Sequence, residues 1–108
     1  MQSEDLVNAL RGPSNHKLPV FYAKLSPSMK AEVRRQYVKE QEGKCYYCDA
    51  PLSGEPPDLI KERAINWSLF PEYFLNHPVH LHHDHGTGLT LGAVHAYCNA
   101  VLWQYHGE

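Results

Sequence analysis

The chain has 108 residues, 43% of them hydrophobic, which is enough for one domain with a small core. No apolar run approaches the roughly 20 residues that span a bilayer, and the acidic N-terminus lacks the pattern of a signal peptide. We therefore expect a soluble cytoplasmic protein without a membrane partner. The net charge of −2 by itself argues against a nucleic-acid binder.

The basic residues are unevenly distributed along the chain. All ten Lys and Arg residues lie at or before Arg63, and residues 11–39 contain seven of them but only one acidic residue, Glu32. A local basic stripe can bind phosphates in a protein of negative net charge, because exposed charges are screened beyond roughly 10 Å. A solvated helix face explains the pattern equally well, so charge alone leaves both interpretations open.

Residues 1–25 are predicted to form an N-terminal arm, and residues 26–108 the main zinc-containing domain. Within the arm, residues 6–10 suit a short helix that ends at Gly12-Pro13. The apolar stretch LPVFYAKL at the end of the arm is expected to pack on the main domain.

A helix is predicted to begin at Ser26-Pro27, because Ser is a good N-cap and Pro suits the first helical position. Gly43 is the expected stop. Three apolar residues recur at a spacing of four and form one stripe: Met29, Val33 and Tyr37. Four basic residues occupy the other faces: Lys30, Arg34, Arg35 and Lys39.

Two pairs of potential metal ligands follow, each with two residues between its members. Cys45 and Cys48 lie in GKCYYCDAPL, and His95 and Cys98 lie in HAYC. The spacing lets both members of a pair face one ion, so the four residues are predicted to form a closed Cys3His site for structural zinc. Three Cys residues cannot all pair as disulfides, which also favours a metal. The alternative is that His95 and Cys98 are merely buried.

The segment between the two pairs is the least regular part of the chain. We predict one or two short helices within residues 58–76. Its apolar residues are expected to be core, with a DNA-facing wedge as the less favoured alternative; they are Ile65, Trp67, Leu69, Phe70, Tyr73, Phe74 and Leu75. Tyr97 and Trp103, farther along, are likewise expected in the core, with base stacking as the less favoured alternative.

From Pro78 the pattern predicts a β-hairpin followed by a helix. VHLHHD and LTLGAV both alternate, and Gly86-Thr87-Gly88 separates them. AYCNAVLWQY suits a helix, and Gly107 lies just past its end. The fold class is therefore a small, zinc-stapled α+β domain in the order helix, zinc knuckle, irregular helical insert, β-β-α.

The stretch VHLHHDH contributes no ligand to the predicted zinc site. In a strand, His82 and His83 point to opposite sides, which suggests that one binds a metal and the other handles a proton. Imidazole, with a pKa near 6.5, suits proton transfer at neutral pH. The side-chain oxygen of Asn99 is a hard, neutral ligand for Mg²⁺ or Mn²⁺.

The combination C-x2-C, HLHHDH, GTG and LTLGAVH-x2-CN resembles the HNH (His-Me finger) endonucleases, closest to the phage recombination endonuclease VII branch. The resemblance covers residues 43–100, with residues 55–77 unmatched. It implies a ββα-metal motif and a phage-encoded DNA endonuclease acting in the host cytoplasm.

The resemblance also implies roles for individual residues. His83 would be the general base, His82 and Asn99 the ligands of a catalytic Mg²⁺ or Mn²⁺, and His85 an auxiliary residue. With DNA as the partner, the expected contacts are the four basic residues of the first helix, Lys30, Arg34, Arg35 and Lys39.

The sequence departs from the endonuclease VII branch in three ways. That branch usually has Asp at the position of His82, so metal preference is expected to shift toward Mn²⁺, Ni²⁺ or Zn²⁺. It also usually has Cys at the position of His95. Only nine residues follow Asn99, where the family's junction resolvase has long dimer-forming helices. A homodimer is kept as an alternative, although the sequence shows no obvious dimerisation element. We expect a nicking or non-specific endonuclease.

Other interpretations are kept for comparison. A non-catalytic zinc module that binds DNA or protein needs neither His83 nor Asn99. A zinc hydrolase of another substrate is less favoured, because HLHHDH does not match the helical HExxH pattern. His80 is expected to support neighbouring residues, with a catalytic role as the less favoured alternative. Asp84 is expected to bind metal, or to orient the turn or a neighbouring imidazole. His77 and His106 are expected to lie at the surface.

Overall fold

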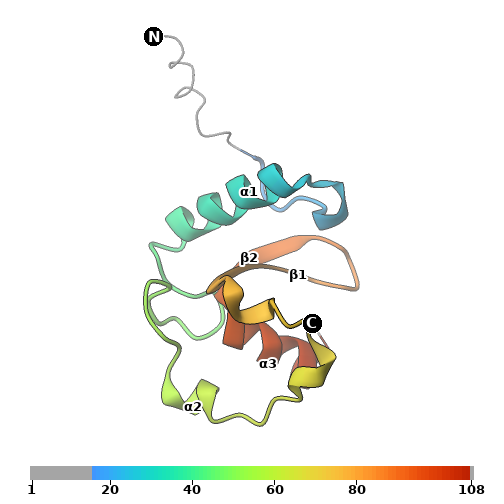
Figure 1. Ribbon diagram of the computed structural model, residues 1–108. Coiled ribbons are helices and arrows are strands. Elements are labelled where there is room, and N and C mark those ends of the chain that lie inside the picture. Colours follow the sequence, from blue (N-terminus) through green and yellow to red (C-terminus); the bar gives the residue numbers. More distant parts are fainter. Residues whose placement is uncertain (1–15, 108) are drawn as a thin grey trace.

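The computed structural model describes residues 16–107, which form a small α+β unit with one two-stranded antiparallel sheet (Figure 1). The hairpin lies between two helices, with α1 on one side and α3 on the other (Figure 1). The predicted helix at residues 6–10 lies outside the described residues. The elements are η2 (Tyr22–Lys24), α1 (Pro27–Glu40), α2 (Asp58–Lys61), η3 (Trp67–Leu69), η4 (Phe74–Asn76), β1 (Val79–His83), β2 (Thr90–His95) and α3 (Ala96–His106).

Helix α1 begins where the sequence predicts it. The Ser26 hydroxyl accepts the backbone N–H of Met29 at 3.2 Å, and Pro27 occupies the first turn. Val33 is fully buried and Tyr37 is buried as well, but Met29 is 37% exposed. The predicted apolar stripe is thus confirmed over its last two positions.

The C-terminal end of α1 leads directly into the first cysteine pair. The helix ends at Glu40, and the chain turns through left-handed backbone at Glu42 and Gly43, with φ of 57° and 77°. The backbone N–H of Gly43 donates to the carbonyl of Val38 at 2.8 Å, which satisfies one of the last helix carbonyls. Gly43 therefore serves as the stop that the sequence predicts.

The stretch LPVFYAKL packs on the main body as expected. The backbone of Val20 accepts a hydrogen bond from the Thr90 N–H at 2.9 Å and donates one to the Thr90 hydroxyl at 3.1 Å. The Tyr22 N–H donates to the carbonyl of Gly88, and Leu25 joins the buried core. These contacts tie the segment before α1 to the tip and second strand of the hairpin.

The hairpin has an irregular register between His82 and His83. His82 lies opposite Gly92, but His83 lies opposite Thr90, so Leu91 is an extra residue on β2. A Cβ atom at position 92 would lie 2.8 Å from the ring of Tyr46, so only glycine fits there. The sequence shows the alternation of both strands but gives no sign of this bulge.

The insert contains three short turns: α2, η3 and η4. The prediction that its apolar residues are core is wrong, because Leu69 is 50% and Tyr73 66% exposed, and Trp67 and Leu75 are also exposed. The companion expectation for Trp103 is wrong too, since this side chain is 43% exposed. A single helical turn has no continuous stripe to bury.

The aromatic residues of the insert instead pack against one another and against α3. The ring centroids of Phe70 and Phe74 are 4.6 Å apart, and Trp103 meets Phe70 edge to face at 5.4 Å. Tyr97 meets Trp67 in the same way at 5.3 Å. Such pairs add stabilisation beyond their buried area, so they hold the irregular insert on the outer side of α3.

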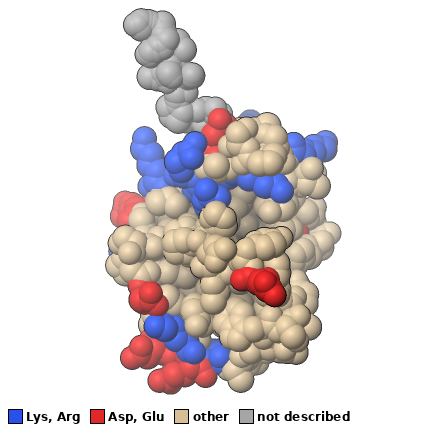
Figure 2. Space-filling model, viewed as in Figure 1, with Lys and Arg blue, Asp and Glu red and all other residues tan. Residues whose placement is uncertain are grey.

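Charged residues are segregated on the surface. In the view of Figure 2, Lys and Arg side chains gather over α1 at the top, and acidic groups mix with basic ones near α2 at the bottom. The middle of this face is mostly uncharged, apart from one acidic patch right of centre (Figure 2). None of the helices within residues 16–107 is both long enough and apolar enough to cross a membrane.

Candidate metal centre and histidine groove

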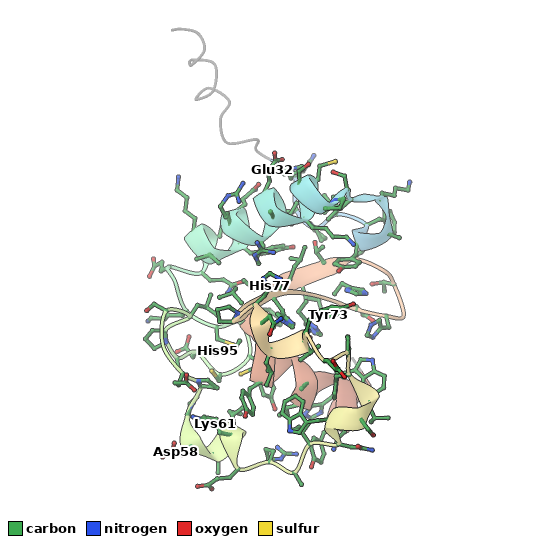
Figure 3. All side chains as sticks on the ribbon, viewed as in Figure 1. Glu32, Asp58, Lys61, Tyr73, His77 and His95 are labelled. Atoms are coloured by element: carbon green, nitrogen blue, oxygen red, sulfur yellow. The ribbon has the colours of Figure 1, made fainter. Side chains whose placement is uncertain are left out.

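The predicted Cys3His group comes together in the structure. Donor atoms of Cys45, Cys48, His95 and Cys98 all lie within 4.8 Å of one another, and three of these residues are buried. Figure 3 shows His95 beside sulfur atoms, in the region between the knuckle loop and α3. The four residues form a group that could hold a metal ion such as zinc.

The loop after α1 is shaped to present the first two thiols. The backbone N–H groups of Tyr47 and Cys48 point at the sulfur of Cys45, at 3.4 and 3.5 Å. The Cys45 N–H donates to Ala50 at 2.8 Å, and Asp49 adopts left-handed backbone with φ of 68°. These contacts close a tight turn and supply donors to a thiolate sulfur.

The orientation of His95 is fixed by a second contact. Its Nε2 lies 2.9 Å from the carbonyl oxygen of Pro51 and must carry a proton to donate to it. Nδ1 is then the basic nitrogen, and it lies 3.4 Å from the sulfur of Cys48 and 3.7 Å from that of Cys98. A hydrogen bond behind a ligating imidazole is a regular feature of metal sites.

The three thiols cannot all ionise at this spacing without a cation. A hydrogen bond from Cys98 lowers the pKa of Cys45 to about 4. The same hydrogen bond, together with burial, raises the pKa of Cys98, and burial raises the pKa of Cys48. A divalent ion among the sulfurs would replace these protons, so the chemistry of the four donors fits a metal.

Two residues that sequence reasoning missed attach the knuckle to β2. The side chain of Gln41 accepts the Ala93 N–H at 2.8 Å and donates to the Ala93 carbonyl at 2.9 Å. The Tyr46 N–H donates to the same carbonyl at 2.9 Å. Gln41 pairs with Ala93 as a neighbouring strand would, although no periodic pattern in the sequence marks it for that task.

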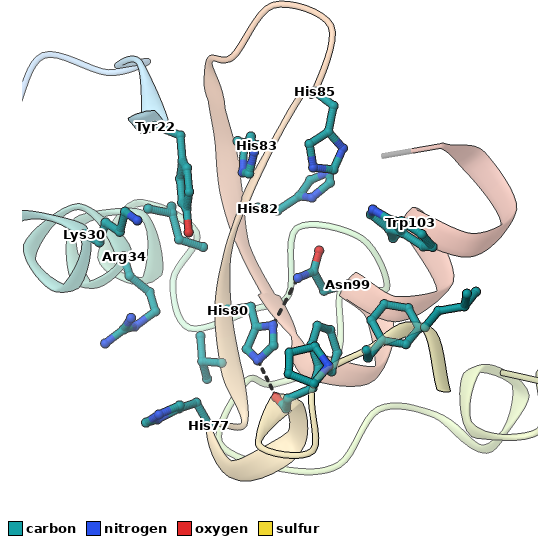
Figure 4. A pocket seen from close by; sticks show the side chains of 16 residues that line it. Tyr22, Lys30, Arg34, His77, His80, His82, His83, His85, Asn99 and Trp103 are labelled. Atoms are coloured by element: carbon teal, nitrogen blue, oxygen red, sulfur yellow. Dashed lines mark hydrogen bonds between the residues drawn. The ribbon is translucent and has the colours of Figure 1, made fainter. Parts of the chain in front are cut away.

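A second, open site lies alongside β1. We call it the histidine groove: a cavity of about 450 Å³ whose floor contains His80, His82, His83, His85 and Asn99. Lys30, Arg34 and Tyr22 line one side, and the insert and Trp103 line the other (Figure 4). The groove brings together every residue to which the resemblance assigns a catalytic role, and it also contains His77, which is exposed as expected.

His80 orients the amide of Asn99. The Nε2 of His80 lies 2.9 Å from the Phe74 carbonyl oxygen, which can only accept, so Nε2 carries the proton. Nδ1 then accepts from the Nδ2 of Asn99 at 3.0 Å. The Asn99 oxygen therefore points away from His80, toward the part of the groove that holds His82 and His85 (Figure 4). Burial lowers the pKa of His80 and favours this neutral form.

His83 is held by aromatic contacts at the edge of the groove. Its ring stacks on that of Tyr22, with centroids 4.0 Å apart and an interplanar angle of 11°, and His85 meets it edge to face at 4.6 Å. Burial, followed by the charges of His85, His82 and Lys30, lowers the pKa of His83 below its usual value. The imidazole is therefore neutral near pH 7 and able to accept a proton.

His82 and His83 leave β1 in different directions, as the alternation predicts, yet both border the groove (Figure 4). His82 is only 2% exposed. Asp84 orients the turn, since its carboxylate accepts the Gly86 N–H at 2.7 Å. Of the roles considered for Asp84, the structure supports orientation of the turn.

The basic residues of α1 divide between two environments. Lys30 and Arg34 line the groove, and the ammonium of Lys30 lies 4.3 Å from the ring centroid of Tyr22. Arg35 and Lys39 are exposed and do not line the groove. The four predicted DNA contacts therefore do not form a single surface around the histidines.

Comparison of the chain with known proteins found no matching family model, no matching curated protein and no matching solved structure. A function for the protein must therefore be argued from its own residues and their geometry.

Proposed function

We propose that the protein is a divalent-metal-dependent endonuclease of the HNH type that hydrolyses DNA phosphodiester bonds. The observation that carries the proposal is the histidine groove, which gathers His82, His83 and Asn99 beside two cationic side chains. The order β1, β2, α3, with a candidate metal cluster where β2 meets α3, is consistent with the ββα-metal arrangement of that family.

His82 and Asn99 are suited to hold the catalytic ion. They offer an imidazole nitrogen and an amide oxygen, and the oxygen is directed into the groove because His80 binds the amide nitrogen. A mixed nitrogen and oxygen donor set suits Mn²⁺ or Ni²⁺ at least as well as Mg²⁺. When bound, such an ion would neutralise charge on the scissile phosphate and on the leaving oxygen.

His83 is the residue suited to activate water. As a neutral imidazole it would take one proton from a water molecule as the water oxygen forms a bond to phosphorus. The bond from phosphorus to the 3′ oxygen breaks in the same displacement. Stacking on Tyr22 restricts the ring of His83 to one orientation, which lowers the entropic cost of reaching the reactive geometry.

Lys30 and Arg34 are suited to position the phosphate backbone on the α1 side of the groove. Arg34 offers a planar guanidinium and Lys30 a point charge, and both reach the groove from one face of α1. Such contacts fix the register of DNA without reading its sequence. The arrangement therefore supports nicking or non-specific cleavage.

A plasmid-nicking assay with Mg²⁺ or Mn²⁺ tests the proposal. His83→Ala is expected to lower the rate by about 10²- to 10⁴-fold, the usual contribution of a general base. His106→Ala is the matched control, because His106 is exposed near the end of α3 and does not line the groove. Cleavage that continues undiminished in His83→Ala would remove the proposed mechanism.

The second candidate is a non-catalytic zinc module that binds DNA or protein. It is favoured by one observation: within residues 16–107, the Cys3His group is the only set of three or more His, Cys, Asp or Glu side chains that converges as a metal site would. This candidate predicts that no second ion binds and that His82, His83 and Asn99 are dispensable.

A further inference from the structure

The two sides of the histidine groove differ in chemistry. Lys30 and Arg34 contribute positive charge from α1 on one side (Figure 4). Leu69 and Phe70 of the insert, together with Trp103 of α3, contribute an apolar and aromatic surface on the other. We call the second surface the aromatic wall. The histidines and Asn99 lie between the two sides.

The aromatic wall is exposed yet rigidly supported. Trp103 is 43% exposed, and its ring rests edge to face against Phe70, which in turn packs on Phe74 at 4.6 Å. Phe74 is fixed against the ring of His80 at 4.6 Å, edge to face. The aromatic wall is therefore a contiguous apolar patch beside a polar groove, and such patches mark interaction sites more than single exposed side chains do.

Charge indicates what the groove accommodates. No Asp or Glu is among the described residues that line it, whereas one Lys, one Arg and five His residues are. A polyanion would neutralise the positive charges on the α1 side, and a flat apolar group would pack on the aromatic wall. A phosphodiester chain with an accessible base offers both at once, whereas an apolar peptide would leave Lys30 and Arg34 without an anionic partner.

Base pairing decides which nucleic acid can use both sides. In a duplex the faces of the bases are stacked on one another, so an aromatic side chain cannot cover them without unstacking a step. In a single strand every base presents a face, and stacking on aromatic residues is a general mode of single-strand binding. The volume of about 450 Å³ falls within the range of sites for small molecules, so it is large enough for a nucleotide.

We propose that the aromatic wall, with Trp103 at its centre, binds an unpaired nucleobase and that the groove prefers single-stranded DNA to duplex DNA. The inference deepens the proposed function and rests on it for the choice of nucleic acid as the ligand. The insert, which is unmatched in the resemblance to HNH endonucleases, then contributes Leu69 and Phe70 to the surface that selects the substrate.

Tryptophan fluorescence gives a direct test. The chain has two Trp residues, so Trp67→Phe leaves Trp103 as the only reporter. The probes are an oligothymidylate of about 12 nucleotides, within the site sizes of single-strand binders, and a blunt duplex of equal length, both without divalent ions. Quenching of Trp103 by the single strand at lower concentration than by the duplex is the expected result.

Variants of the wall provide the second arm. Trp103→Ala is expected to weaken binding of the single strand by roughly 5- to 100-fold, and Trp103→Phe, which keeps a stacking ring, by much less. Tyr73→Ala is the matched control, because Tyr73 is an exposed aromatic residue of the insert that does not line the groove. If Trp103→Ala does not fold, Trp103→Phe and the fluorescence of Trp67→Phe still decide the result.

Two outcomes would overturn the inference: equal affinity for single strand and duplex, or single-strand binding that Trp103→Ala leaves unchanged. Neither outcome depends on cleavage. If the protein shows no preference for single-stranded DNA but nicking still depends on His83, only the role of the aromatic wall would be rejected. Intact single-strand binding in a protein that does not cleave would reject the endonuclease and keep the wall.

Discussion

The Cys3His group is mostly buried and the histidine groove is open to solvent, although the same hairpin and helix contribute residues to both. Cys98 and Asn99 are neighbours in the first turn of α3, but adjacent helical residues point about 100° apart. Cys98 therefore faces the buried Cys3His group, and Asn99 faces the histidine groove. Two adjacent residues of α3 thus belong to two different sites, one buried and one open to solvent.

Closure distinguishes what the two sites can do. The Cys3His group supplies four donors within 4.8 Å of one another, which fills a tetrahedral coordination shell and leaves no position for substrate. In the proposed function, the groove would offer the imidazole of His82 and the amide oxygen of Asn99 beside a cavity of about 450 Å³, so water and phosphate could complete the shell of an ion there. The first arrangement suits a structural ion, and the second is the one that we propose for a catalytic ion.

Removing the metal from the closed site should have the largest effect. Structural zinc contributes about 10–16 kcal/mol in zinc-finger peptides, which rivals the ~5–15 kcal/mol total stability of a typical domain. We expect a chelator to abolish cooperative thermal unfolding followed by circular dichroism, and added zinc to restore it. An unchanged melting curve in protein shown by metal analysis to be zinc-free would mean that the cysteines are merely buried.

A change at the open site should affect metal binding without affecting the fold. In calorimetric titration of zinc-loaded protein with Mn²⁺, we expect one saturable site that Asn99→Ala weakens by at least about 10-fold. Asn76→Ala is the control, since Asn76 is exposed in η4 and does not line the groove. The absence of any second Mn²⁺ site would favour the non-catalytic zinc module.

The smallest expected effect lies outside both sites. The hydroxyls of Tyr37 and Thr90 are 2.9 Å apart in the core and join α1, which carries Lys30 and Arg34, to β2. Tyr37→Phe should lower the free energy of unfolding by about 1 kcal/mol, measured by urea denaturation. Nicking and Mn²⁺ affinity should not change. If either falls together with stability, the groove depends on the position of α1 more closely than the contacts indicate.

Local rules predicted much of the fold. The start of α1 depends only on Ser26 and Pro27, and each ligand pair depends only on a two-residue spacing, so neighbouring residues suffice to reveal them. The hairpin and α3 follow from alternation and from Gly107, which has left-handed backbone with φ of 74° as a helix stop. These features are encoded within a few residues and need no knowledge of distant contacts.

The insert shows where such rules fail. Its apolar residues resemble a core in composition, but three short helical turns cannot align them into one buried face. Two of them, Leu69 and Phe70, instead form part of the aromatic wall. The contacts of Gln41 with Ala93 likewise join residues that are 52 positions apart. No periodicity relates such pairs, so the sequence offers no signal for them.

The sequence by itself determined which side chains have metal-binding and proton-transfer chemistry, because residue type and short spacing are local properties. Only the tertiary structure decided how they are presented. It turned the Asn99 oxygen into the groove through His80, placed His83 against Tyr22, and set cationic and aromatic surfaces on opposite sides. The physical reason is that orientation depends on hydrogen bonds and packing between segments distant in the chain.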